Sequence, residues 1–260
     1  MDALHAECKN CHNSLNEGDK FCAKCGQNTD THKINLHYVM HELLHGILHI
    51  DGGIIQTTKD LFTKPGIMVR EYLEGKRKNH FSPIIYIVIL STIMALIMHY
   101  VYHDRYMELT FVDASNPTDI QKRIIEIFAP IFNWVSKHFT LIYLLQIPLM
   151  AFAFYIPFKK MSGYSYFEWL LIISFCMIQL MIITIIFQLL NRILPGINIV
   201  VNIFVLGVLT WTILQLFSKF DTSKVIINYI LSLVILFFLL ALFSIGFVIY
   251  YLNSNPDFLQ

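Results

Sequence analysis

Charged residues are scarce in this sequence. Only 14% of the 260 residues are Asp, Glu, Lys or Arg, whereas 56% are hydrophobic; a soluble domain usually devotes about a quarter of its residues to charge. A water-soluble fold of this length could not bury that much apolar surface and still cover itself with polar groups. Intrinsic disorder is excluded too, because disordered chains have low hydrophobicity. The composition therefore predicts an integral membrane protein.

The first 35 residues lack a long apolar stretch, and with it the hydrophobic core of a secretory signal peptide. Four of the five cysteines lie in this polar segment, while Cys176 stands alone in an apolar run and reads as a packing residue. Cysteines kept in a reducing compartment bind metal more often than they pair as disulfides. We therefore expect a cytoplasmic metal site at the N-terminus.

The spacing of these cysteines is that of a zinc ribbon. Cys8-x-x-Cys11 and Cys22-x-x-Cys25 are separated by ten residues, and two such pairs can complete a tetrahedron around one ion. Gly26 suits the positive φ common in these turns. The pattern predicts one structural zinc ion bound by all four thiolates; the alternative is two redox pairs or free thiols. So small a segment has little core, so metal binding would supply much of its folding free energy.

Long uncharged segments dominate the chain after Phe81. A membrane-spanning helix needs about 20 apolar residues, and five segments qualify, near residues 83–101, 139–158, 169–190, 197–217 and 225–252. The expected fold is an all-α polytopic membrane protein with about five transmembrane helices and a small N-terminal zinc ribbon. We divide it into a cytoplasmic zinc ribbon (1–35), amphipathic interfacial helices with a basic linker (36–80) and a transmembrane domain (81–260). An amphipathic outer loop is expected over 102–138.

Basic residues near the ends of the apolar segments predict the orientation, because cytoplasmic loops are enriched in Lys and Arg. One set comprises Lys59, Lys64, Arg70, Lys76, Arg77, Lys78, Lys159, Lys160, Lys219 and Lys224, and the other comprises Arg105, Lys122, Arg123, Lys137 and Arg192. The larger set falls on the side of the N-terminus. We expect the N-terminus in the cytoplasm and the C-terminus outside.

The segment His41-Glu42-Leu43-Leu44-His45 matches the HExxH pattern of zinc proteases. On a helix the two histidines share one face, and Glu42 could polarise a zinc-bound water. A third ligand is required; the candidates, without a specific spacing, are His49, Glu71 and Glu74. The alternative is a His-rich amphipathic interfacial helix. The missing third ligand favours that alternative.

The segment before the first long apolar run has its own pattern. It contains Thr57 and Thr58, then Pro65-Gly66, then the run Tyr72-Leu73-Glu74-Gly75-Lys76-Arg77, with Pro83 following. Together with the four cysteines, this pattern resembles a family of uncharacterised bacterial inner-membrane proteins grouped under a domain of unknown function. The resemblance covers about residues 5–100 and implies a multi-pass protein of the bacterial inner membrane, with no known catalytic residues.

The function expected from the sequence is a non-catalytic interaction or membrane-organising role. Mid-membrane Asp, Glu, Lys and Arg, typical of ion-coupled transport, are absent from the five segments, although Gln179, Gln188 and Asn202 keep a small-molecule or lipid transporter or channel as the alternative. A membrane zinc metalloprotease using His41, Glu42 and His45 is the third hypothesis. The sequence favours a non-enzymatic protein without deciding the question, and it gives no signal for an oligomeric state.

Two partners are expected besides the surrounding bilayer itself. A cytoplasmic protein could bind the zinc ribbon, and anionic lipid headgroups could lie near Lys76, Arg77 and Lys78. Nucleic acid is not expected, because acidic residues offset the lysines of the ribbon and Phe21 is its one aromatic residue for base stacking.

Overall fold

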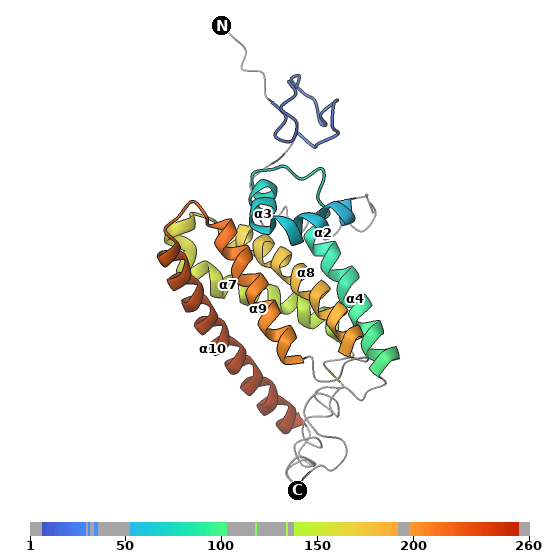
Figure 1. The fold of residues 1–260 in the computed structure, drawn as a ribbon, viewed down its shortest axis with the longest axis vertical. Coiled ribbons are helices and arrows are strands. Elements are labelled where there is room, and N and C mark those ends of the chain that lie inside the picture. Colours follow the sequence, from blue (N-terminus) through green and yellow to red (C-terminus); the bar gives the residue numbers. More distant parts are fainter. Residues whose placement is uncertain are drawn as a thin grey trace.

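The computed structural model describes residues 7–29, 31, 34–35, 53–102, 118, 134, 138–191 and 198–254. Within these residues the chain forms seven α-helices and no β-strand (Figure 1). They are α2 (Gly53–Thr63), α3 (Pro65–Leu73), α4 (Pro83–Tyr102), α7 (Phe139–Ser162), α8 (Tyr166–Asn191), α9 (Asn198–Leu216) and α10 (Thr222–Ser254). His41 to His45 and most of residues 102–138 lie outside the described residues.

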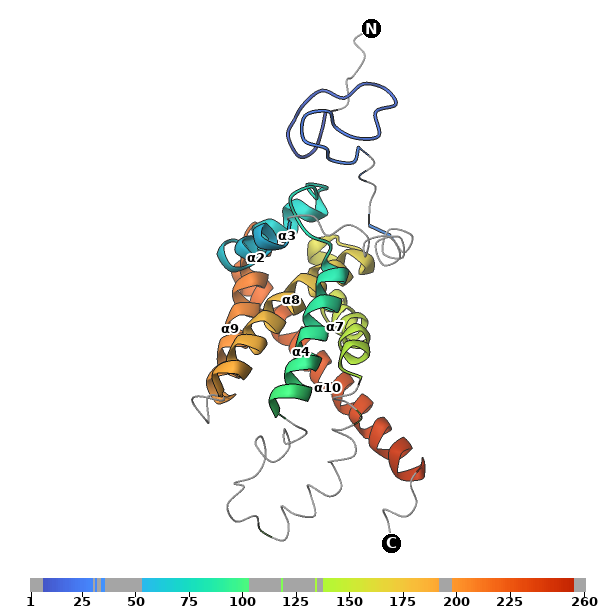
Figure 2. The same ribbon diagram turned by 90° about the vertical axis from the view of Figure 1, so that its right-hand side faces the viewer.

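The five long helices form an antiparallel bundle with α8 at its centre (Figures 1 and 2). In α8, 61% of the residues in its apolar stretch are buried inside the protein. In α10, which runs along the outside of the bundle, the share is 6%. The core around α8 includes Phe154 of α7, Ile213 of α9 and Ile87 of α4. These helices are apolar on all sides, as expected for helices that face either lipid or other helices.

Four described helices, α4, α7, α8 and α10, are long and apolar enough to cross a membrane. The fifth, α9, is a shorter apolar helix of 19 residues, about 28 Å at 1.5 Å per residue. In lipid every backbone polar group must find a partner within the protein, which a helix achieves along its own length. The all-α polytopic fold expected from the sequence is confirmed.

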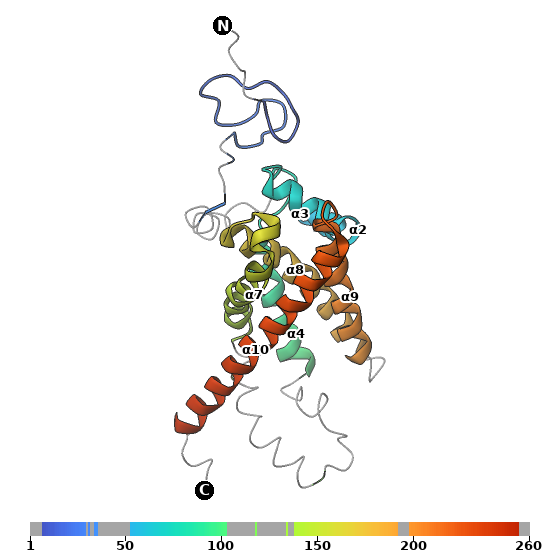
Figure 3. The same ribbon diagram turned by 90° about the vertical axis from the view of Figure 1, so that its left-hand side faces the viewer.

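Two short helices, α2 and α3, cover one end of this bundle (Figures 1 and 3). Pro65 opens α3, as its fixed φ favours at a first helical position, and Gly75 follows the helix with a φ of 105°. The apolar residues of α3 could face either lipid or protein. Met68 and Tyr72 are buried in the protein core, whereas Ile67 is exposed. Hydropathy cannot separate the two environments, because both are apolar.

The cysteine-containing segment lies beyond α2 and α3, at the same end of the molecule (Figures 2 and 3). It holds two isolated antiparallel bridges, Glu7 with Ser14 and Phe21 with Asn28. Its own apolar core consists of Leu15 and the cysteines. The α7–α8 and α9–α10 connections also reach this end, whereas α10 ends at the opposite one.

Candidate metal centre

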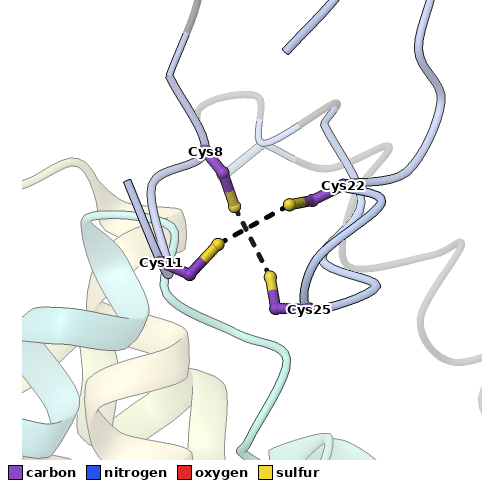
Figure 4. A group of neighbouring side chains, drawn as sticks. All are labelled: Cys8, Cys11, Cys22 and Cys25. Atoms are coloured by element: carbon purple, nitrogen blue, oxygen red, sulfur yellow. Dashed lines mark hydrogen bonds between the residues drawn. The ribbon is translucent and has the colours of Figure 1, made fainter. Parts of the chain in front are cut away.

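Cys8, Cys11, Cys22 and Cys25 point toward one common centre (Figure 4). Their sulfur atoms all lie within 4.8 Å of one another, with 3.6 Å between Cys8 and Cys25 and 3.6 Å between Cys11 and Cys22. A tetrahedral ion with metal–sulfur bonds of about 2.3 Å places its sulfurs about 3.8 Å apart. The four predicted ligands are therefore brought together at distances that suit one metal ion.

The two Cys-x-x-Cys turns have the same backbone geometry, offset by 14 residues. In the first turn the N–H of Cys8 donates to the carbonyl of Asn13 (2.9 Å) and that of His12 to the carbonyl of Cys8 (2.8 Å). In the second turn these bonds recur as Cys22 to Gln27 (2.8 Å) and Gly26 to Cys22 (2.8 Å). His12 and Gly26 occupy the matching left-handed positions, with φ of 58° and 70°.

This geometry aims a backbone N–H at a sulfur in each turn, that of Cys11 and that of Cys25. The N–H of Asn13 lowers the pKa of Cys11, but desolvation and the three neighbouring thiols raise it to about 12. Desolvation raises the pKa of Cys25, but the N–H of Gln27 and other polar neighbours bring it to about 6. The thiols cannot all ionise so close together without a cation, and a bound metal supplies that charge.

All four positions of a tetrahedral ion would be filled by cysteine, which leaves no site for water or substrate. Such closed sites are structural, whereas catalytic zinc keeps one position open. The surrounding segment has almost no core of its own, with Cys8 and Cys22 each 2% exposed and Leu15 8% exposed. Within the part of the chain that the structure describes, this is the one cluster of three or more His, Cys, Asp or Glu placed to hold a metal.

The metal centre rests on the loop between α3 and α4 through Gln27. The side-chain oxygen of Gln27 accepts hydrogen bonds from the N–H of Lys78 (2.8 Å) and of Arg77 (3.2 Å). Gln27 is 4% exposed, and its amide nitrogen donates to the carbonyl of Asn28 (3.2 Å). Sequence reasoning missed this residue, since one Gln after a Cys-x-x-Cys-Gly turn gives no signal of a contact 50 residues away.

The Pro65-Gly66 element has a structural role at the end of α9. The side-chain oxygen of Gln215 accepts hydrogen bonds from the N–H groups of Gly66 (2.7 Å) and Ile67 (3.4 Å), so it caps the N-terminus of α3. In return, the guanidinium of Arg70 donates to the carbonyls of Gln215 (2.9 Å) and Leu216, the last residues of α9. The two helix ends thus satisfy each other's unpaired backbone groups.

The threonine pair connects α2 to α4. The hydroxyl oxygen of Thr57 accepts the N–H of Phe81 (2.8 Å), and the hydroxyls of Thr58 and Tyr86 are hydrogen-bonded at 2.6 Å. Each threonine therefore ties α2 to the segment that starts the first long helix.

Gln179, a candidate for a polar path, is fully buried. Its amide nitrogen donates to the carbonyl of Leu61 (2.7 Å), and its oxygen accepts from the Thr212 hydroxyl (2.9 Å). It joins α2, α8 and α9, which is the helix-to-helix bonding more usual for such residues.

Two other predicted site residues also take part in local contacts. Glu71, a candidate third protease ligand, forms an ion pair with Lys76 at 3.1 Å. Arg77 donates through Nε to the carbonyl of Tyr72 (3.2 Å) and lies 5.5 Å from the centre of the Tyr72 ring. Glu74 is exposed.

The fold and the cysteine cluster together define a polytopic, all-helical membrane protein with a four-cysteine site able to bind one metal ion. Residues 51–95 match the model of a family described as a protein of unknown function (DUF3667). The match spans α2, α3, the loop after α3 and most of α4, and does not include the four cysteines. No curated protein and no solved structure matches the chain.

Proposed function

We propose that this chain is a non-catalytic interaction or membrane-organising protein of the bacterial inner membrane, with a zinc ribbon as its structural head. The convergence of four thiols with no coordination position left open carries this proposal, because such a site stabilises a fold and does not turn over substrate. The polar residues of the family-matched segment also support this proposal. Thr57, Thr58 and Arg70 form hydrogen bonds to other parts of this chain.

Zinc is the metal we assign. A set of four thiolates suits zinc or iron among the common metals, and a structural role without electron transfer favours zinc. A segment whose core is little more than Leu15 and its cysteines needs the ion for its stability.

The metal and the role are tested together on the purified full-length chain. We expect about one zinc per chain in the wild type, and near zero in Cys22→Ser, because three thiolates bind zinc far more weakly.

The interaction role is tested by cross-linking in cells, followed by capture of this chain. A specific cytoplasmic protein should be recovered with the wild type and lost with Cys22→Ser. Cys176→Ala is the matched control, since it removes the thiol that lies outside the cluster. A wild-type chain purified without zinc contradicts the metal assignment.

The partner surface we propose is the part of the ribbon around Phe21, whose side chain is 61% exposed. A large exposed aromatic residue on so small a unit is a typical anchor in protein interfaces. If this surface binds the partner, Phe21→Ala should weaken capture while the zinc content stays the same.

We also propose contact with anionic lipid headgroups at this end of the molecule. Three basic residues are expected to contact the headgroups. Lys76 forms an ion pair with Glu71 and the guanidinium of Arg77 lies over the Tyr72 ring, while Lys78 is exposed. Exposed Lys59, Lys159 and Lys219 add to the positive charge at this end.

One observation favours the alternative of lipid handling. A groove of about 270 Å³ opens between α7, α8, α9 and α10, and a few polar residues, Tyr143, Gln146 and Thr184, lie among its apolar ones. This character fits a lipid chain better than a polar solute. Lipid flux in proteoliposomes, unchanged in Cys22→Ser, would favour this function over the interaction role.

A further inference from the structure

We propose that the docking face of the ribbon, formed by Lys9, Gly26 and Gln27, has this chain's own α3–α4 loop as its ligand, and that metal binding holds this face in shape. The inference rests on the proposed structural metal and adds an intramolecular partner for the ribbon. The part of the loop concerned comprises residues 74–80, and the loop as a whole joins the end of α3 at Leu73 to the start of α4 at Pro83.

Gln27 makes the central contact. Two consecutive backbone N–H groups, those of Arg77 and Lys78, converge on its single side-chain oxygen. The Gln27 side chain is almost fully buried, so the contact excludes water. Two convergent donors on one buried acceptor form a specific binding geometry, which a random encounter of two polar surfaces does not produce.

A glycine on the loop allows a close approach at this contact. On the ribbon, Gly26 lies beside Lys78, and a Cβ at Gly26 would be at an ordinary contact distance of 3.5 Å from Cε of Lys78. On the loop, a Cβ at Gly75 would lie 2.9 Å from Cδ of Lys9, and Gly75 has a φ of 105° that favours glycine. The Lys9 ammonium donates to the carbonyl of Thr31 (3.3 Å), which fixes the side chain over the loop.

The cysteine turn sets the backbone position of Gln27, from which its side chain extends to the loop. The carbonyl of Gln27 accepts the N–H of Cys22, and its own N–H is directed at the sulfur of Cys25. Lys9 likewise lies between the ligands Cys8 and Cys11. Lys9 and Gln27 of the docking face therefore belong to the two cysteine turns. Loss of the metal would release the turns and with them the face that binds the loop.

The loop in turn is coupled to the membrane helices. The N–H of Lys76 donates to the carbonyl of Glu71 (2.9 Å) at the end of α3, and the N–H of Phe81 donates to Thr57 of α2. Binding of the ribbon thus acts on the connection between α3 and α4. It also occupies the Gln27 face, which leaves the side of Phe21 for a second protein.

Amide hydrogen exchange on the full-length chain in lipid nanodiscs tests this proposal. In the zinc-loaded wild type we expect protection at Arg77 and Lys78. In Gln27→Ala we expect about tenfold faster exchange at these two amides, since they lose their acceptor, with the zinc content unchanged. Gln27→Glu should restore the protection, because a carboxylate oxygen also accepts two N–H groups. Glu17→Gln, on the exposed connection between the two turns, is the matched control and should behave as the wild type.

Removal of zinc by a chelator should accelerate exchange both in the ribbon and at residues 74–80. The proposal is overturned if chelation leaves residues 74–80 unchanged, or if Gln27→Ala keeps its zinc and its protection. It is overturned as well if Gln27→Ala loses its zinc, because Gln27 would then support the metal site and not the loop. A chain purified without zinc refutes the proposed metal, yet the comparison of Gln27→Ala with Gln27→Glu still tests the contact with the loop.

Discussion

At the scale of single residues, several positions fit one part of the chain against another. Gly66 packs directly on the backbone at the end of α9, and Gln27 receives the backbone of a loop 50 residues away. Thr57 accepts a backbone N–H at the start of α4. None of these contacts depends on chemistry with a substrate. Gly66 and Thr57, both in the family-matched segment, therefore hold helices in place relative to one another.

Gly66 gives a sharp test of this packing. A Cβ at this position would lie 2.6 Å from the carbonyl carbon of Gln215 and closer still to the N of Leu216. Backbone atoms cannot yield as a flexible side chain does, so we expect Gly66→Ala to cost about 1–3 kcal/mol of unfolding free energy or more.

Thermal unfolding in detergent micelles measures the effect. Gly207→Ala, in α9 itself, is the control, because a Cβ there meets nothing within 4 Å and Ala favours the helix. Equal stability of the two variants would show that α3 does not pack on α9 in this way.

At the scale of elements, α3 and α9 stabilise each other by their ends. Helix termini leave backbone N–H and C=O groups unpaired, and here a side chain of each helix satisfies the other. Gln215 of α9 caps the start of α3, and Arg70 of α3 binds the carbonyls at the end of α9. A positive charge at a helix C-terminus is also favourable to the helix dipole. This pairing holds the short helix α9 against α3, one of the two helices that cover this end of the bundle.

Arg70→Met should therefore destabilise the protein by about 1–3 kcal/mol, since it leaves carbonyls at the α9 terminus without their charged donor. Lys59→Met is the control, because Lys59 is an exposed cation on the neighbouring helix α2. Chemical denaturation in mixed micelles, followed by tryptophan fluorescence, gives both values. A loss no greater than that of Lys59→Met would mean that the contact contributes little.

At the scale of the whole molecule, exposed basic residues lie together at the ribbon end of the described bundle. They are Lys159 and Lys160 in the last turn of α7, Lys219 between α9 and α10, and Lys224 at the start of α10. The basic cap of α2 and α3 lies at the same end, and α10 ends at the other. Because positively charged loops stay in the cytoplasm, we propose that the ribbon is cytoplasmic and the C-terminus lies outside.

Reporter fusions test that orientation. Alkaline phosphatase, which folds only outside the cytoplasm, should be active when fused after Gln260, and a green fluorescent protein at the same place should stay dark. The same fluorescent protein fused before Met1 is the control and should be bright. A fluorescent C-terminal fusion would reverse the proposed topology.

The sequence by itself determined the long helices and the four cysteines of the candidate metal site. Apolar runs of about 20 residues form helices in a bilayer, since no water is present to pair the backbone groups. The two Cys-x-x-Cys pairs can be recognised as metal-binding turns because their spacing involves only neighbouring residues. Pro65 marked the start of α3 for the same local reason. These features need no knowledge of what lies next to them.

The tertiary structure alone decided which apolar surfaces face protein. It placed α8 in the centre, buried Met68 and Tyr72, and brought Gly66 to Gln215 and Gln27 to Lys78. Lipid and protein interior are equally apolar, so hydropathy cannot tell them apart. Contacts between residues 50 or 150 positions apart depend on how the helices pack, which a local pattern does not contain.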